Sequence, residues 1–115
     1  MVFIRHILDE TDYLIDKSVG LTYDDFIADA TLMRAFARSL EIIGEASKNT
    51  SESFRLKHAE IKWKEIAGLR DKLIHQYFSI DWHILWDVVK HNIPELRKKL
   101  ENIVNDTQKN YRQHL

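Results

Sequence analysis

The stretch TLMRAFARSLEIIGEA, residues 31–46, decides how the chain folds. Its apolar residues recur every three or four positions, the period of an α-helix with one apolar face; they are Leu32, Phe36, Leu40 and Ile43. Gly44 lies inside this helix, where glycine costs about 1 kcal/mol relative to alanine. We therefore expect Gly44 to allow a second helix to pack closely against this one.

Upstream of this stretch the same period predicts another helix over about residues 2–17. Gly20 is a suitable residue to end it, because glycine readily adopts the left-handed conformation that follows many helices. Thr22 and Asp25 form a variant of the capping box, which predicts a short helix through Phe26 and Ile27.

Downstream, residues 49–60 are polar and predict a loop containing at most one helical turn. The helical period resumes over residues 63–77, and Asp81 is a good N-cap for the helix after it. Pro94 predicts a helix boundary or a kink, because proline fits the first turn of a helix but not its interior. The last residues, 105–115, are polar and could fray.

The composition is that of one ordinary globular domain of 115 residues, with 44% hydrophobic and 30% charged residues. One proline and three glycines are too few for a sandwich or barrel with many tight turns. We therefore predict an all-α fold over residues 1–115, an antiparallel bundle of four long helices plus one or two short ones. We expect the three tryptophans, Trp63, Trp82 and Trp86, to serve packing.

The chain has 17 Lys and Arg residues and 18 Asp and Glu residues, which give a net charge of −1. This balance excludes a strongly basic protein that coats nucleic acid. A local site for an anionic ligand remains compatible with this balance. No apolar run approaches the roughly 18 residues that span a bilayer. The first residues also lack a secretion signal. We therefore expect a cytoplasmic protein with no membrane segment.

Metal chemistry has little support in the sequence. There is no cysteine, which excludes disulfides, a thiol nucleophile and thiolate metal ligands. No two histidines stand four residues apart. His75, His83 and His91 are each eight residues apart, so successive positions rotate by about 80° around an ideal helix. We predict neither a metal site nor a cofactor.

The segment GLRDKLIHQYF, residues 68–78, combines the residues best suited to chemistry. Arg70 can grip a phosphate in a bidentate fork. His75 can carry protons near neutral pH, because the pKa of a free histidine is about 6.5. Together they suffice for metal-free RNA cleavage, in which the ribose 2′-hydroxyl is the nucleophile. The alternative is a polar strip in which Arg70 pairs with Asp71 and His75 is structural.

Helix geometry constrains this pair. Five residues along an α-helix turn by 500°, so Arg70 and His75 lie about 140° apart around a straight helix. On the same straight helix, the position of Tyr77 would lie within about 20° of that of Arg70 around the helix axis. For Arg70 and His75 to contact one phosphate, either the helix distorts near residues 75–78, or a second subunit in a twofold dimer completes the site.

The chain resembles the HepT-like proteins, a branch of the HEPN superfamily, from about residue 3 to residue 104. It carries their Arg-x4-His-x-Tyr motif as Arg70, His75 and Tyr77. The surrounding segments also match, at residues 38–46, 63–70, 78–81, 86–89 and 94–96. One departure is Lys62, where the family often has proline before the tryptophan.

The resemblance implies a dimeric helical bundle that brings two such motifs into one cleft and cleaves RNA without a metal. It implies a toxin of a toxin–antitoxin pair whose antitoxin is an MNT-type nucleotidyltransferase, which silences the toxin by transferring AMP to Tyr77. Asp71 would belong to the catalytic site with Arg70 and His75. Glu41 and Glu45 match recurrent positions of the family. We expect them to serve packing or intrahelical pairing, although a role in the site stays open.

A second function from a different class is a non-catalytic subunit. In that case the bundle would hold the nucleotidyltransferase partner, and the strip from Arg70 to Tyr77 would bind a nucleotide or an acidic surface. An RNA cleavage assay distinguishes the two.

Overall fold

The computed structural model describes the backbone of residues 2–75 and 77–113, and the side chains of residues 2–73 and 78–109. All its regular structure within those residues is helical. The elements in chain order are α1 (Val2–Ser18), α2 (Tyr23–Ile27), α3 (Ala30–Asn49), α4 (Glu52–Lys57), α5 (Trp63–His75), a 3₁₀ turn (Tyr77–Ser79), α6 (Trp82–Asp87), a π-helical turn (Val88–Asn92) and α7 (Ile93–Gln113).

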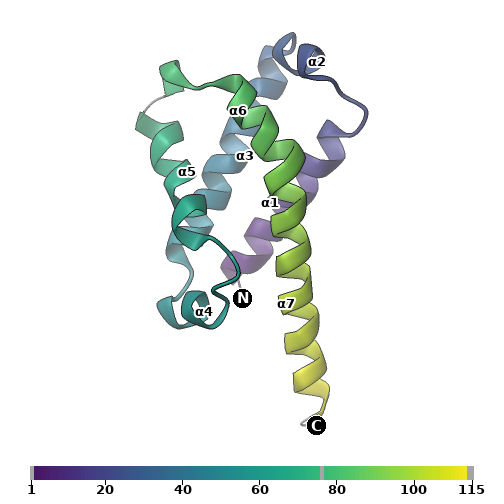
Figure 1. Cartoon of the computed structure of the whole chain (residues 1–115), viewed down its shortest axis with the longest axis vertical. Helices are drawn as coiled ribbons and strands as arrows, with labels where there is room; N and C mark the ends of the chain where they lie inside the picture. Colours follow the sequence, from purple (N-terminus) through teal and green to yellow (C-terminus); the bar gives the residue numbers. More distant parts are fainter. Residues whose placement is uncertain (1, 76, 114–115) are drawn as a thin grey trace.

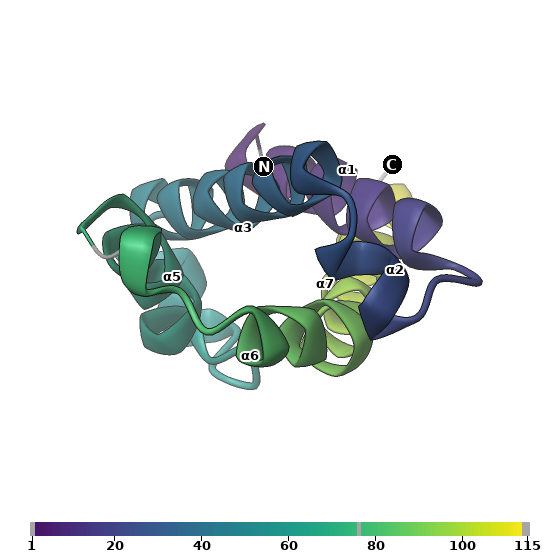
Figure 2. The same ribbon diagram turned by 90° about the horizontal axis from the view of Figure 1, so that it is seen from above.

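The long helices run up and down in an antiparallel bundle (Figure 1). α3 packs between α1 and α5, and α1 also packs against α7. Seen from above, α1 and α3 form one side, α5 lies beside one end of α3, and α6 lies across from α3 (Figure 2). α6, the π turn and α7 follow one another as a single rod, so the described chain has four long helical elements and two short helices. The predicted fold class is confirmed.

Local capping residues determine where the first helices begin and end, as predicted. α1 ends at Ser18 and is followed by Gly20, which has a φ of 75°. Thr22 caps α2 by accepting a hydrogen bond from the Asp25 backbone N–H, and the Asp25 carboxylate accepts one from the Thr22 N–H. Asp29 then caps α3 through the Leu32 N–H. These bonds satisfy backbone donors that a helix leaves unpaired at its start.

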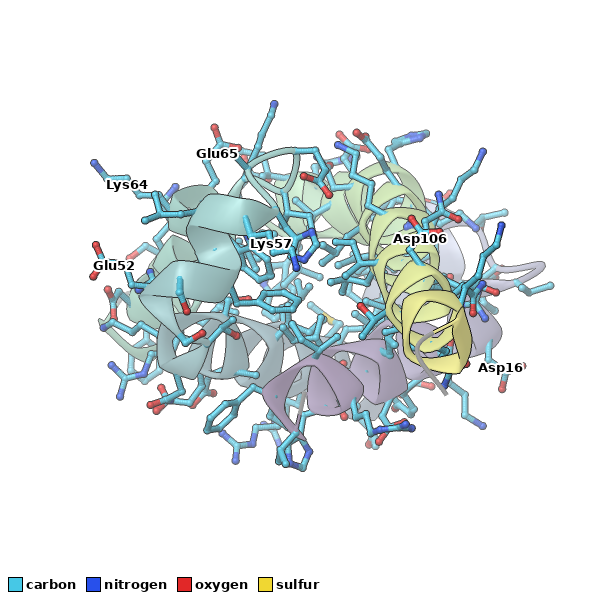
Figure 3. All side chains as sticks on the ribbon, turned by 90° about the horizontal axis from the view of Figure 1, so that it is seen from below. Asp16, Glu52, Lys57, Lys64, Glu65 and Asp106 are labelled. Carbon is cyan, nitrogen blue, oxygen red and sulfur yellow. The ribbon has the colours of Figure 1, made fainter. Side chains whose placement is uncertain are left out.

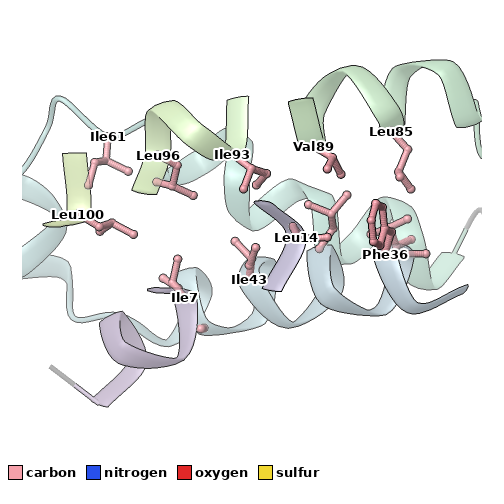
Figure 4. Close-up of a cluster of buried hydrophobic side chains, with 14 of the residues drawn as sticks. Ile7, Leu14, Phe36, Ile43, Ile61, Leu85, Val89, Ile93, Leu96 and Leu100 are labelled. Carbon is pink, nitrogen blue, oxygen red and sulfur yellow. The ribbon is translucent and has the colours of Figure 1, made fainter. Parts of the chain in front are cut away.

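The core lies between the α1–α3 side and the α6–α7 rod. Figure 4 shows side chains of α1 and α3, such as Ile7 and Ile43, facing those of the rod, such as Val89 and Leu96. At one end of the core the Phe26 ring stacks on two other aromatic rings. The ring centroids are 5.2 Å apart for Phe26 and Phe36 and 5.1 Å apart for Phe26 and Trp86. Trp63 and Trp86 are buried and Trp82 partly buried, which confirms their predicted packing role. Charged side chains such as Glu52, Lys64 and Asp16 point outward (Figure 3).

The boundary at Pro94 takes the form of a π-helical turn. Pro94 lies in the first turn of α7 and has no N–H to donate to the carbonyl of Lys90, so the regular ladder is interrupted there. The Lys90 ammonium donates to the Ser18 carbonyl at 3.3 Å and lies 5.6 Å from the Trp86 ring. The rod is thereby tied to the end of α1.

Two regions differ from the sequence expectation in extent. The polar stretch at residues 49–60 contains a defined short helix, α4, which Ser51 caps through the Phe54 N–H. α7 continues to Gln113, so the backbone is helical over residues 105–113, where the polar composition suggests fraying. Among the described residues, no helix is both long and apolar enough to cross a bilayer.

Candidate active site

The candidate site is built where α5 crosses α3 at Gly44. A Cβ atom at Gly44 would lie 2.6 Å from the Arg70 backbone nitrogen and 2.8 Å from the Arg70 Cβ. Real Cβ atoms essentially never show such contacts. The missing side chain therefore lets α5 approach α3 at the very residue predicted to bind phosphate. The prediction that Gly44 permits close packing is confirmed.

Arg70 is held by two carboxylates. Its Nε lies 2.6 Å from Glu45 Oε2 on α3, and its Nη1 donates to Asp71 Oδ1 at 3.2 Å. About a third of the Arg70 side chain stays exposed. Contacts at two different nitrogens restrict the guanidinium plane, and the exposed part leaves the cation accessible to a ligand from solution.

Asp71 links this arginine to a second cation. Lys48 Nζ on α3 donates to Asp71 Oδ1 at 3.2 Å, the same oxygen that Arg70 contacts. The hydrogen bond from Lys48, followed by that from Arg70, lowers the pKa of Asp71 below its ordinary value of 3.8. Asp71 is therefore an anion at neutral pH and cannot act there as a proton donor.

Glu41 and Glu45 have different partners although they stand one turn apart on α3. Glu41 pairs within its own helix, with Arg38 Nη1 at 2.9 Å, as the sequence interpretation expects. Glu45 instead pairs across the helices with Arg70, so it contacts a predicted site residue, which is the alternative that the sequence interpretation left open. It also accepts a hydrogen bond from Asn49 Nδ2 at 3.3 Å.

His75 and Tyr77 belong to the predicted site, but their side chains lie outside those that the structure describes. Their backbone is described: α5 ends at His75, and a 3₁₀ turn begins at Tyr77. The backbone is α-helical from Arg70 to His75, so these two positions lie about 140° apart around α5. The change of helix type falls after His75.

A groove opens beside Arg70 between α1, α3 and α5. Its volume is 450 Å³, and it is lined by Phe3 and His6 of α1, Arg38, Glu41, Glu45 and Asn49 of α3, and Arg70 of α5. We call it the Arg70 groove. Among the side chains that the structure describes, no three His, Asp or Glu residues are grouped as metal ligands.

Sequence reasoning missed Lys48, left the role of Glu45 open, and gave Phe3 and His6 no role. One signal was available for the first two. Glu45 and Lys48 follow Gly44 within about one turn of α3, and a glycine inside a helix marks where another helix comes close. No comparable signal places α1 beside Arg70.

The chain is similar to known proteins of one family. A family model described as HepT-like, "Ribonuclease HepT-like", matches residues 7–103. The chain is 50% identical over 102 residues to "Putative RNase TTE0752" of Caldanaerobacter subterraneus subsp. tengcongensis, covering 89% of this chain and 91% of that protein. It is 41% identical over 101 residues to "Probable ribonuclease HepT" of Thermococcus cleftensis, covering 88% and 92% respectively. No solved structure gives a significant match.

Proposed function

The chain belongs to the HepT-like ribonuclease family, and from this premise we propose that it is a metal-independent ribonuclease with Arg70, His75 and Asp71 as catalytic residues. It acts in the cytoplasm as a homodimer of a single domain, residues 1–115. It is the toxin of a toxin–antitoxin pair, and an MNT-type nucleotidyltransferase is the antitoxin that silences it by transferring AMP to Tyr77.

The observation that supports the activity most directly is the presentation of Arg70. The guanidinium is restrained by Glu45 and Asp71 yet still about a third exposed beside a groove. A restrained cation on a helix suits transition-state stabilisation, because little reorganisation is needed when charge develops on the substrate. An arginine used only for packing would not need an open groove at its side.

The proposed reaction uses the RNA's own nucleophile. The ribose 2′-oxygen attacks the adjacent phosphorus, the bond from phosphorus to the 5′-oxygen breaks, and a 2′,3′-cyclic phosphate remains. His75 removes the proton of the 2′-hydroxyl or donates one to the leaving 5′-oxygen. Arg70 stabilises the negative charge on the phosphoryl oxygens. Asp71, held anionic by Lys48 and Arg70, orients the guanidinium.

The homodimer follows from the positions of the two main residues. Arg70 and His75 are separated by about 140° around a regular helix, which disfavours one phosphate meeting both within one chain. A twofold axis beside α5 brings Arg70 of one copy toward the same residue segment of the other. The composite cleft would then hold two arginines and two histidines.

Silencing through Tyr77 has a simple electrostatic basis. The tyrosine oxygen attacks the α-phosphorus of ATP, and pyrophosphate leaves. The AMP group added in this way is a bulky anion seven residues along the chain from Arg70, at the start of the 3₁₀ turn that follows α5. Its phosphate can occupy the arginine and block RNA entry.

The test is RNA cleavage by the purified protein in the presence of EDTA. We expect wild-type protein to cut RNA, and Arg70→Ala and His75→Ala to abolish cutting. His91→Ala, which removes an exposed histidine on the π turn, is the matched control and keeps activity. Intact RNA combined with tight binding of the nucleotidyltransferase would instead support a non-catalytic subunit.

A further inference from the structure

We propose that the Arg70 groove binds one nucleotide of single-stranded RNA that flanks the scissile phosphate, with its base on Phe3 and its phosphate on Arg38. This inference rests on the proposed function, because it extends the substrate away from the linkage at Arg70. The groove volume of 450 Å³ falls within the roughly 300–1,000 Å³ of small-ligand sites.

Arg38 supplies the phosphate contact. Its side chain is 66% exposed, and it pairs with Glu41 of the same helix at 2.9 Å. Exposed pairs of this kind are weak, so a phosphate can replace the carboxylate. Arg38 precedes Glu45, the partner of Arg70, by seven residues, which is two turns and about 10 Å along α3. Arg38 and Arg70 line the same groove, so a short single-stranded segment in it can contact both arginines.

Phe3 supplies the stacking surface. It is a large apolar residue that is 40% exposed at the start of α1, although most such residues of this helix face the core. His6 lies three residues later and also lines the groove. Bases stack on aromatic rings in single-stranded nucleic-acid sites because every base presents a π-face. A duplex, whose bases are stacked on one another, does not offer that face.

Glu41 and Asn49 give the groove a preference among bases. A carboxylate repels phosphate but accepts hydrogen bonds from an exocyclic amino group, such as that of cytosine. Glu41 lies about one turn from Arg38 on α3 and lines the groove, so a base edge suits this carboxylate better than a phosphate does. Uracil has no exocyclic amino group. The Glu41 carboxylate therefore favours cytidine over uridine at this position.

Binding is tested apart from cleavage with 2′-O-methyl oligonucleotides, which lack the nucleophilic hydroxyl. Fluorescence anisotropy measures their dissociation constants with wild-type protein, Phe3→Leu and Arg38→Ala. We expect each variant to bind a cytidine oligomer roughly tenfold more weakly, and wild type to bind a uridine oligomer more weakly than the cytidine one. Lys98→Ala removes one exposed cation on α7 and is the charge-matched control, with less than about a twofold effect.

Cleavage then separates this inference from the proposed function. If wild type cuts RNA, Phe3→Leu and Arg38→Ala should raise KM and leave kcat nearly unchanged. If wild type leaves RNA intact, the proposed function fails, while weaker oligonucleotide binding by the variants still supports the groove. Unchanged dissociation constants in both variants, or equal binding of duplex and single-stranded RNA, overturn the proposal. Circular dichroism and gel filtration confirm that the variants keep their fold and oligomeric state.

Discussion

Arg70 Nε lies 2.6 Å from Glu45 Oε2, so an arginine of α5 is held by a carboxylate of α3. The two helices meet at Gly44, the residue immediately before Glu45. Gly44 thus allows the two helices to approach closely. At this short distance Glu45 contacts and orients the guanidinium of Arg70, the predicted phosphate-binding group.

Glu45 is therefore expected to act as a positioning residue for Arg70. Glu45→Ala should lower kcat for RNA cleavage roughly tenfold, about the effect of losing one charge-assisted hydrogen bond. Glu45→Gln keeps an acceptor oxygen and should recover part of the loss. Glu101→Ala, which removes the partner of Arg97 on α7, is the control with normal kcat. Equal rates for Glu45→Ala and wild type would contradict the role.

Gly44→Ala should destabilise the fold. The new Cβ would force α5 away from α3 at Arg70, and overpacking of this kind costs about 1–3 kcal/mol. Gly68→Ala is the matched control, because a Cβ there meets nothing within 4 Å. That variant should instead gain about 0.5–1 kcal/mol from helix propensity. Urea unfolding measures both, and stabilisation by both substitutions would refute the close approach.

The Lys48–Asp71 contact should appear in acid titration. The hydrogen bond from Lys48 lowers the pKa of Asp71, so Lys48→Met should move that pKa up toward 3.8. Because the folded pKa is depressed, the carboxylate contributes stability above its ordinary value of 3.8 and loses it as pH falls through the lowered pKa. Carboxyl NMR titration of Asp71 checks the shift, and an unchanged pKa in Lys48→Met would rule out the contact in solution.

Tyr77→Phe separates catalysis from silencing. Removing only the phenolic oxygen should keep RNA cleavage near the wild-type rate and prevent AMP transfer. Mass spectrometry after incubation with the nucleotidyltransferase and ATP should find one AMP group on the wild-type protein and none on the variant. Loss of cleavage in Tyr77→Phe would show instead that the tyrosine takes part in the reaction.

The aromatic core between α2, α3 and α6 should be a major source of stability. Phe26 is fully buried and stacks on both Phe36 and Trp86. Phe26→Ala should cost about 3–5 kcal/mol of unfolding free energy, since it removes these contacts and leaves a cavity. Leu56→Ala, at a residue 73% exposed, should change it by less than about 0.5 kcal/mol. Chemical denaturation compares the two.

Much of the fold could be predicted because its signals are local. The capping box of Thr22 and Asp25, the turn at Gly20 and the cap at Asp81 each involve residues within four positions of one another. The break at Pro94 was also predictable, but its form as a π turn was not. Pro94 accounts for the interruption, while the π turn and α7 also pack against α1, a long-range contact that no local pattern encodes.

The site was predictable only in part. The sequence by itself determined that Arg70, Asp71 and His75 share one helix, because the apolar residues around them recur with the helical period. The same period also predicts Tyr77 on this helix, and there it is wrong, because α5 ends at His75 and Tyr77 begins a 3₁₀ turn. Only the tertiary structure decided that Glu45 and Lys48 reach Arg70 and Asp71, and that Phe3 and Arg38 line the same groove. Those contacts depend on which helix faces meet and how closely, and the distance at Gly44 is set by the atoms of two helices packed together rather than by either alone.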